Sequence, residues 1–260
     1  MVPPRGGERA GRVVTVGTGT CVPRLRRGGP CVLLESGGFR CVVDLGLGAL
    51  HGLLRAGVAH GAVDALLLTH HHPDHLAELL PLLFAANYGQ PPRRRPLQIT
   101  GSPGSLAAVA RLAETQEGWL DARNYLQTST PLRPGDQLAL GPFRVRAGAV
   151  AHIDSSLAYR FETVTGSVVV SGDTGPSESL VELARSADLL LLEASLAAGD
   201  SCETHLTAQQ AGTLADRAGV GHLVLVHLYP AAEAVDPGAA AAAAFGGPVT
   251  VAEDGMEWEF

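Results

Sequence analysis

The chain has 260 residues, of which 46% are hydrophobic, so it can bury a substantial core in one large domain or two modest ones. Its net charge of −7 makes it a poor default binder of nucleic acid, and all 19 of its basic residues are arginines. Residues 1–10 hold two arginines without a following apolar run, and no window reaches the ~18 apolar residues of a membrane span. We therefore expect a cytoplasmic protein with no membrane partner and no secretory signal.

The first half of the chain alternates predicted strands with predicted helices. The strand-like segments are residues 12–16, 31–35, 40–44, 63–69 and 97–101. The helix-like segments are residues 49–56, 76–86 and 105–114. Because the helix predicted at 76–86 begins directly after a histidine-rich turn, this part of the chain is expected to form a strand-turn-helix unit that carries polar side chains in its turn.

The second half repeats the alternation without a fixed period. The strand-like segments are residues 137–140, 143–150, 157–163, 167–171, 189–193 and 223–227. The helix-like segments are residues 177–184, 207–218 and the alanine run 239–244. No linker of flexible composition separates the two parts, so we predict one domain over residues 1–260 with two βα-rich halves, at about 12–140 and 141–260.

The cysteines and the arginine clusters favour structural roles. The four cysteines form no C-x-x-C pair, which argues against a zinc knuckle and a redox dithiol, and Cys31 and Cys41 lie in strand-like segments where we expect buried thiols. Arginines gather at residues 24–27 and 93–95. Both clusters are predicted to be solvated loop surface, with contact to a phosphate as the alternative.

The densest group of potential metal ligands follows the apolar run 65–68. Within six residues the chain carries His70, His72, Asp74 and His75. Alternate residues of an extended segment share a face, so His70 and His72 can point at one place while the turn brings Asp74 and His75 beside them. Such density is hard to explain without a metal, and the arrangement has room for two cations.

A site with two metals needs further ligands, and three polar residues follow apolar strands in the required way. His152 follows the strand at 143–150, Asp173 follows the strand at 167–171, and His227 ends the strand at 223–227. Four further histidines have no assigned role, namely His51, His60, His71 and His222.

At these residues the chain resembles the metallo-β-lactamase-fold hydrolases, whose H-x-H-x-D-H signature is matched from His70 to His75. The resemblance spans roughly residues 12–230 and implies an α/β fold, a four-layer αββα sandwich. It also implies that Asp44 is the family's early structural aspartate, which supports the ligands from behind.

Carried over residue by residue, the resemblance implies two divalent metal ions. His70, His72 and His152 would bind one, Asp74, His75 and His227 the other, with Asp173 bridging them. Nitrogen and oxygen ligands suit zinc, although manganese or iron tolerates the same set. Paired cations lower the pKa of a shared water toward neutrality, so such a site makes its own nucleophile for hydrolysis.

A more specific resemblance is to the ribonuclease Z-like phosphodiesterase branch. It rests on the glycine turn at residues 16–20, the turn at 171–175, and Glu193 followed by the His205-Leu206-Thr207 segment. The resemblance implies that His205 protonates the leaving group and that Glu193 orients it, while Asp74 also hydrogen-bonds the attacking water. Backbone amides at Thr18, Gly19 and Thr20 are expected to bind substrate phosphate.

True ribonuclease Z carries a glycine- and proline-rich arm that grips transfer RNA, and no such insertion lies between Asp173 and His227. Together with the negative charge, this favours a smaller phosphodiester as substrate, such as a cyclic nucleotide or a short oligonucleotide. The alternatives are tRNA 3′ processing, hydrolysis of an aryl sulfate, lactone or thioester, and a metal-binding scaffold without activity. We expect a homodimer, with the segment 116–125 as a lip or interface.

Overall fold

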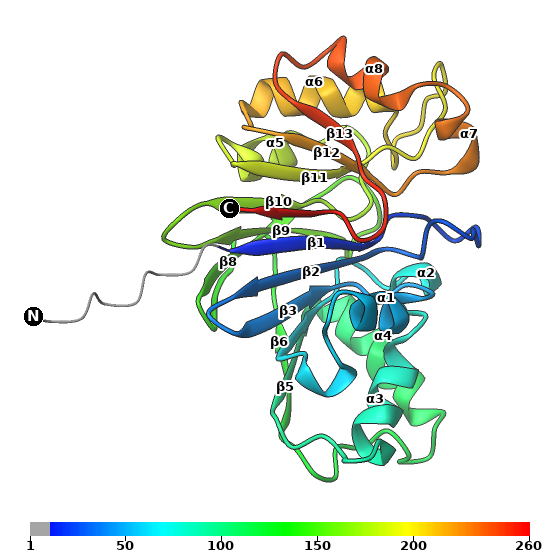
Figure 1. Cartoon of the computed structure of the whole chain (residues 1–260), viewed down its shortest axis with the longest axis vertical. Coiled ribbons are helices and arrows are strands. Elements are labelled where there is room, and N and C mark those ends of the chain that lie inside the picture. The colour runs from blue at the N-terminus through cyan, green and yellow to red at the C-terminus, as the bar shows by residue number, and fades with distance from the viewer. Residues whose placement is uncertain (1–10) are drawn as a thin grey trace, which may run out of the picture.

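The computed structural model describes residues 11–260, and the expected lack of a secretory signal falls on residues outside this range. Two mixed β-sheets face each other, and helices cover the outer face of each (Figure 1). The predicted four-layer αββα sandwich is therefore confirmed. None of the helices in residues 11–260 is both long and apolar enough to cross a bilayer.

The first sheet has seven strands in the order β14-β1-β2-β3-β4-β5-β6. Its strands are β1 (Arg12–Gly17), β2 (Cys31–Ser36), β3 (Phe39–Val43), β4 (Ala65–Leu67), β5 (Leu97–Gly101), β6 (Gln127–Pro131) and β14 (Glu257–Glu259). Pairing is antiparallel from β14 to β3 and parallel from β3 to β6.

The second sheet also has seven strands, in the order β13-β12-β11-β10-β9-β8-β7. Its strands are β7 (Gln137–Leu140), β8 (Phe143–Ala149), β9 (Leu157–Glu162), β10 (Ser167–Val170), β11 (Leu189–Glu193), β12 (Leu223–Val226) and β13 (Val249–Val251). Pairing is antiparallel from β7 to β10 and parallel from β10 to β13, so both sheets are mixed.

The helices divide between the two outer layers. The first layer contains α1 (Ala49–Arg55), a 3₁₀ turn (His60–Ala62), α2 (Pro73–Leu76), α3 (Leu79–Tyr88) and α4 (Pro103–Glu114). The second layer contains α5 (Glu178–Ala184), α6 (Ala208–Ala218), α7 (Pro230–Glu233) and α8 (Pro237–Ala242).

Strands buried on both faces explain the continuous apolar runs in the sequence. In β2, Val32 and Leu34 pack into the core between the sheets, whereas Cys31 and Leu33 pack under the first helical layer. This alternation places successive side chains in different cores. Cys31 and Cys41 are both buried free thiols, as the sequence predicts.

Two predicted boundaries near the site differ from the structure. The helix expected at 76–86 begins earlier, at Pro73, and is interrupted before Leu79, because the Glu78 amide donates to Leu45 O at 2.9 Å and His75 O accepts from Leu45 N at 2.8 Å. The division at residue 140 also does not match the sheets. β7 already belongs to the second sheet, and β14 returns from the C-terminal part to the edge of the first.

Candidate metal centre

The histidine cluster occupies the turn between β4 and α2. The extended backbone before the helix lets His70 and His72 point to the same side, with His70 Nε2 3.0 Å from His72 Nδ1. Pro73 is the first residue of α2, and its fixed φ angle suits that position. The helix therefore starts at once and brings Asp74 and His75 to the same place.

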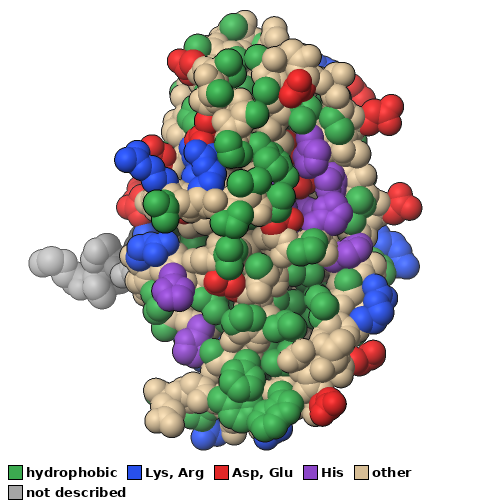
Figure 2. Space-filling view, turned by 90° about the vertical axis from the view of Figure 1, so that its right-hand side faces the viewer, with side chains coloured by type: hydrophobic (Ala, Val, Ile, Leu, Met, Phe, Trp, Pro, Cys, Tyr) green, Lys and Arg blue, Asp and Glu red, His purple; other side chains and the backbone are tan. Residues whose placement is uncertain are grey.

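The structure gathers all seven predicted ligands into two groups, and within each group the ligand atoms lie within 4.8 Å of one another. The first group is His70, His72, His152 and Asp173, and the second is Asp74, His75 and His227. On the molecular surface, several histidine side chains gather in a patch at the right of the view beside hydrophobic side chains, and two others lie apart from it (Figure 2). The two groups correspond to the two metal positions that the family resemblance implies.

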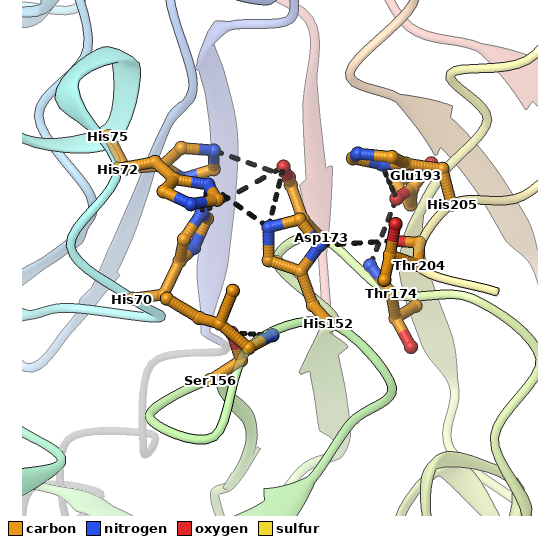
Figure 3. Close-up of polar contacts among 12 residues, drawn as sticks. His70, His72, His75, His152, Ser156, Asp173, Thr174, Glu193, Thr204 and His205 are labelled. Atoms are coloured by element: carbon orange, nitrogen blue, oxygen red, sulfur yellow. Dashed lines mark hydrogen bonds and ion pairs between the residues drawn. The ribbon is translucent and has the colours of Figure 1, made fainter. Parts of the chain in front are cut away.

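Asp173 belongs to the first group and also faces His75 of the second, and Figure 3 shows His70, His75 and His152 around it. Its Oδ1 atom is 3.2 Å from His75 Nε2 and 3.4 Å from His227 Nε2. Its Oδ2 atom is 3.9 Å from His70 Nε2 and 3.8 Å from His152 Nε2. Each carboxylate oxygen thus faces one group, which is the geometry of a bridging ligand.

Gly172 lets the Asp173 loop approach the histidine turn. Its φ angle is +60°, a left-handed conformation that favours glycine, and a Cβ atom there would stand 2.6 Å from the Thr69 Cβ. Asp173 follows a strand of the second sheet and Thr69 follows a strand of the first. The centre is therefore assembled where loops of the two sheets touch.

In four of the five histidines of the ligand groups, the Nδ1 atom lies within hydrogen-bonding distance of a protein oxygen. The pairs are His70 with Thr69 Oγ1 (3.1 Å), His75 with Asp44 Oδ2 (2.7 Å), His152 with Thr204 O (3.1 Å) and His227 with Ser195 Oγ (2.8 Å). The two hydroxyls donate their own protons elsewhere, so all four oxygens can accept from Nδ1–H. Each Nε2 then keeps a lone pair that faces the centre, the form in which imidazole binds a metal.

Asp44 supports the histidine turn from behind. Its buried carboxylate accepts hydrogen bonds from Thr69 N at 2.8 Å, Thr69 Oγ1 at 2.6 Å and His75 Nδ1 at 2.7 Å. The residue itself has a φ angle of +59°, an uncommon conformation for a side chain other than glycine. Asp44 thus contacts the predicted ligand His75 and also Thr69, the residue before His70, but it belongs to neither ligand group.

The donor atoms fit divalent cations. Within residues 11–260, His75 Nε2, Asp173 Oδ1 and His227 Nε2 are buried and have no hydrogen-bond partner. Leaving a buried polar atom unpaired costs about 1–3 kcal/mol, and a cation between these atoms would satisfy all three.

The pKa shifts of the predicted ligands also fit a site for divalent cations. Burial alone would raise the pKa of Asp173, but His227 and His75 hold it well below its usual range. Burial lowers the pKa of His70 far enough to keep it neutral. Burial opposes protonation of His75 as well, yet Asp173 and Asp44 raise its pKa well above the usual value, so a proton and a cation compete for His75 Nε2.

A histidine and a glutamate lie beside the ligands. Glu193, fully buried at the end of β11, has its Oε1 atom 2.7 Å from His205 Nδ1. The hydrogen bond to Glu193 raises the pKa of His205, against the effect of burial. The His205 ring centroid is 5.0 Å from that of His152 and 6.4 Å from that of His227. His205 therefore lies against the rings of His152 and His227, with its Nδ1 atom on a buried carboxylate.

Glu193 also ties three loops together. Its two oxygens accept hydrogen bonds from the backbone amides of Thr174 (2.9 Å), Ser195 (3.1 Å) and Leu206 (3.2 Å). These amides adjoin, respectively, the bridging aspartate, the strand end that bonds His227, and His205. One buried carboxylate thus fixes several parts of the centre at once.

Comparisons with known proteins agree with this geometry. A beta-lactamase superfamily domain model matches residues 40–228. A ribonuclease Z of Mycobacterium sp. (strain KMS) is 34% identical over 239 residues, which cover 84% of each chain. The metallo-beta-lactamase fold protein YhfI from Bacillus subtilis superposes with a TM-score of 0.83 at 26% identity, over 97% of this chain and 100% of that one.

The chain belongs to the beta-lactamase superfamily. Within the superfamily it is a ribonuclease Z-like, metal-dependent hydrolase, and the fold implies divalent metal ions. The crystal structure of the short form of human tRNase Z, at 23% identity, has the same fold, with a TM-score of 0.77 over 95% of this chain and 98% of that one. Between Asp173 and His227 the structure describes α5, β11 and α6 with their loops, and no protruding arm.

In the glycine turn at residues 16–20, two of the three amides expected to bind phosphate, those of Thr18 and Gly19, already have partners in the protein. Thr18 N donates to Asp254 Oδ1 at 2.9 Å, and Gly19 N donates to Gly28 O at 2.8 Å. Thr20 is buried, and its hydroxyl accepts from Val22 N at 3.2 Å. The amides of Thr18 and Gly19 are occupied by the protein itself, so the turn holds the fold together.

The two arginine clusters are only partly solvated, contrary to the prediction. Arg27 is buried, with its Nε atom 2.7 Å from Glu233 Oε1, and Arg93 is buried and donates to backbone carbonyls that include those of Arg95 and Pro96. The five donors of a guanidinium can satisfy several acceptors at once, which favours such burial in loops.

Sequence reasoning missed three residues that orient the histidines. Thr69 and Ser195 act through hydroxyls, and each stands within two residues of a predicted site residue. Thr204 acts through its backbone carbonyl, which any residue would supply, so no side-chain pattern marks it. His71, to which no role was assigned, points away from the centre, and its Nδ1 lies 3.0 Å from Ser155 Oγ.

We expect Asp173→Ala to lose bound metal, because it removes the carboxylate that faces both groups. Metal content of the purified protein, measured by atomic emission, should fall to less than half of the wild-type value while circular dichroism stays unchanged. Asp154→Ala removes an exposed carboxylate two residues from His152 and should keep full metal content. Normal metal content in Asp173→Ala would contradict a bridging role.

Proposed function

We propose that this protein is a phosphodiesterase that holds two divalent cations and hydrolyses a small or short nucleotide phosphodiester. The observation that carries the proposal is the His205–Glu193 pair, which places a proton donor beside the ligand rings. Hydrolysis of an unactivated phosphodiester expels an alkoxide, a poor leaving group that needs such a donor.

Zinc is the proposed metal. Five imidazoles and two carboxylates are ligands that zinc accepts readily, and manganese or iron tolerates the same set. When bound, the cations would supply a water of lowered pKa and positive charge for the phosphate oxygens. The sites would be His70, His72 and His152 for one cation and Asp74, His75 and His227 for the other, with Asp173 shared.

The protein's own groups supply the remaining steps. The Asp74 side chain is 14% exposed, and its Oδ2 atom lies 3.6 Å from His227 Nε2. Its carboxylate can therefore accept a hydrogen bond from the attacking water and orient it toward phosphorus. The His205 imidazolium donates its Nε2 proton to the departing oxygen, and Glu193 keeps the ring in place.

A small substrate is favoured by charge and by shape. The chain carries a net charge of −7, and residues 171–227 contain no protruding arm that would grip a folded RNA. A cyclic nucleotide or a short oligonucleotide needs neither an extended basic surface nor an arm.

tRNA 3′ processing is the second candidate. Relatives named ribonuclease Z match over most of this chain, for example the protein from Mycobacterium bovis (strain BCG / Pasteur 1173P2) at 31% identity over 93% of this chain and 95% of that one. The same catalytic groups would serve either substrate, so the two candidates differ only in what surrounds the reacting phosphate.

A panel of substrates separates these reactions. We expect turnover of bis(p-nitrophenyl) phosphate and of a dinucleotide, with p-nitrophenyl sulfate and a lactone hydrolysed at least 100-fold more slowly. Cleavage of a precursor tRNA at its 3′ end with a higher kcat/KM than the dinucleotide would favour the second candidate. Absence of phosphodiester turnover in the zinc-loaded protein would rule out the main proposal.

His205→Ala should keep its metal and lose turnover on substrates with poor leaving groups. General acid catalysis contributes about 10²- to 10⁴-fold, so kcat for a dinucleotide should fall by that factor, and kcat for bis(p-nitrophenyl) phosphate should fall far less. His51→Ala, an exposed histidine away from the centre, serves as the matched control. Normal dinucleotide turnover in His205→Ala would refute the acid assignment.

The pH profile follows from the raised pKa of His205. His205 is protonated at a pH below the ordinary pKa of 6.5 and loses its proton as the pH rises through the raised pKa. Above that pH the enzyme loses both the proton donor and the ion pair with Glu193 that stabilises the fold. We expect kcat for the dinucleotide to decline at a pH above 6.5. The same limb should be absent for bis(p-nitrophenyl) phosphate and for His205→Ala.

A homodimer and a cytoplasmic location complete the proposal. Trp119, in the segment 116–125, is 54% exposed, and its ring centroid lies 5.7 Å from that of the exposed ring of Tyr88, which in turn lies 4.6 Å from that of Phe84. Large exposed apolar patches are typical of interfaces. Light scattering should give twice the chain mass for the wild type and the monomer mass for Trp119→Ser, and a monomeric wild type would contradict the dimer.

A further inference from the structure

A groove begins at the histidine turn and runs between α2, α3 and α4. Its volume is about 590 Å³, within the ~300–1,000 Å³ typical of small-ligand sites. The apolar lining comes from Leu76 and Leu80 on one side and from Ala108 and Leu112 on the other. Leu112 is 40% exposed, so the groove is open to solvent.

The groove adjoins the metal centre through His71. This residue stands between two predicted ligands, and because neighbouring residues of an extended segment face opposite sides, its ring lines the groove instead. The ring centroids of His71 and His72 are 6.4 Å apart. The groove therefore begins one residue away from His72, a member of the first ligand group.

Close packing fixes the position of the groove relative to the metal centre. A Cβ atom on Gly104, in the first turn of α4, would stand 2.9 Å from the Ser155 Cβ, so α4 presses against the loop that follows His152. Ser155 Oγ also lies 3.0 Å from His71 Nδ1. The groove wall is thus joined directly to the chain segments that carry the ligands.

The charged side chain that lines the groove is positive. Arg111 of α4 lines it, and within residues 11–260 its guanidinium has no ion pair or hydrogen bond. No carboxylate lines the groove. An unpaired guanidinium next to an apolar floor suits a ligand that joins a flat apolar ring to an anion, and arginine binds phosphate through two parallel hydrogen bonds.

We infer that this groove binds the nucleoside next to the scissile phosphate, with its base against Leu76, Leu80 and Leu112 and its further phosphate on Arg111. The inference rests on the proposed phosphodiesterase function and narrows its substrate. A linear oligonucleotide has a second phosphate to offer Arg111, whereas a cyclic mononucleotide has only the phosphate under attack. The substrate class is therefore a linear oligonucleotide end.

Kinetics with three diesters test the inference. For a linear trinucleotide we expect Arg111→Ala to raise KM about tenfold with kcat nearly unchanged, the loss typical of one charged hydrogen-bonded contact. Bis(p-nitrophenyl) phosphate and a cyclic mononucleotide, which lack the second phosphate, should keep their kcat/KM within twofold. Arg94→Ala, which removes an exposed arginine outside the groove, is the control and should change none of these values.

The apolar floor is tested in parallel by Leu112→Asp, with Leu54→Asp on α1 as the control for a charge placed on an exposed helical leucine. Only Leu112→Asp should raise KM for the trinucleotide. An unchanged trinucleotide KM in both groove variants, with normal turnover of bis(p-nitrophenyl) phosphate, would overturn the inference and leave the proposed function intact.

Binding gives a readout that does not need turnover. The fluorescence anisotropy of an end-labelled trinucleotide should report about tenfold weaker binding to Arg111→Ala than to the wild type. Equal binding of the trinucleotide by Arg111→Ala and the wild type would overturn the inference. This outcome can be distinguished from failure of the proposed function, which would be a wild type that hydrolyses no diester. A dimeric wild type that Leu112→Asp makes monomeric, with trinucleotide binding unchanged, would assign the groove to a second copy of the chain instead.

Discussion

Seven side chains, each with a potential ligand atom, converge at the contact between the two sheets. The hydrogen bonds and packing around them are arranged to hold these ligand atoms close together. His72 Nδ1 lies 3.0 Å from His70 Nε2 and 3.1 Å from His152 Nε2, and a single proton on His72 Nδ1 can form a linear hydrogen bond with only one of these two atoms. A protein that buries such a set without cations would forfeit several kcal/mol in unpaired polar atoms. The affinity for metal and the stability of this region therefore have the same physical origin.

Two buried carboxylates keep the convergent groups in place, one on each side of the contact between the sheets. Asp44 fixes the histidine turn of the first sheet, and Glu193 fixes the loops of the second. Neither belongs to a ligand group. Each is fully engaged by hydrogen bonds, so the cost of burying its charge is offset and its position is well defined. Gly172 then permits the two loops to touch, and Asp173 comes to lie between the groups.

The sequence predicts much of this arrangement because its strongest signals are local. The alternation at His70 and His72, the close spacing of Asp74 and His75, and polar residues placed just after apolar strands all depend on a few neighbouring residues. Contacts between distant segments leave no such pattern. The hydroxyl of Ser195, the carbonyl of Thr204 and the engagement of Thr18 by Asp254 appear only once the sheets face each other. The groove beside Arg111 likewise requires two helices to be placed in space.

The edge of the first sheet has a consequence for the order of events during synthesis. β1 emerges early, but its outer neighbour β14 lies far along the chain, as the ion pair between Arg12 and Glu257 across 245 positions shows. Domains generally begin to fold while the chain is still being made, and an unpaired edge strand invites association with other chains. The outer edge of β1 therefore stays unpaired until β14 has been made, and the partly made chain exposes an edge that the finished fold covers.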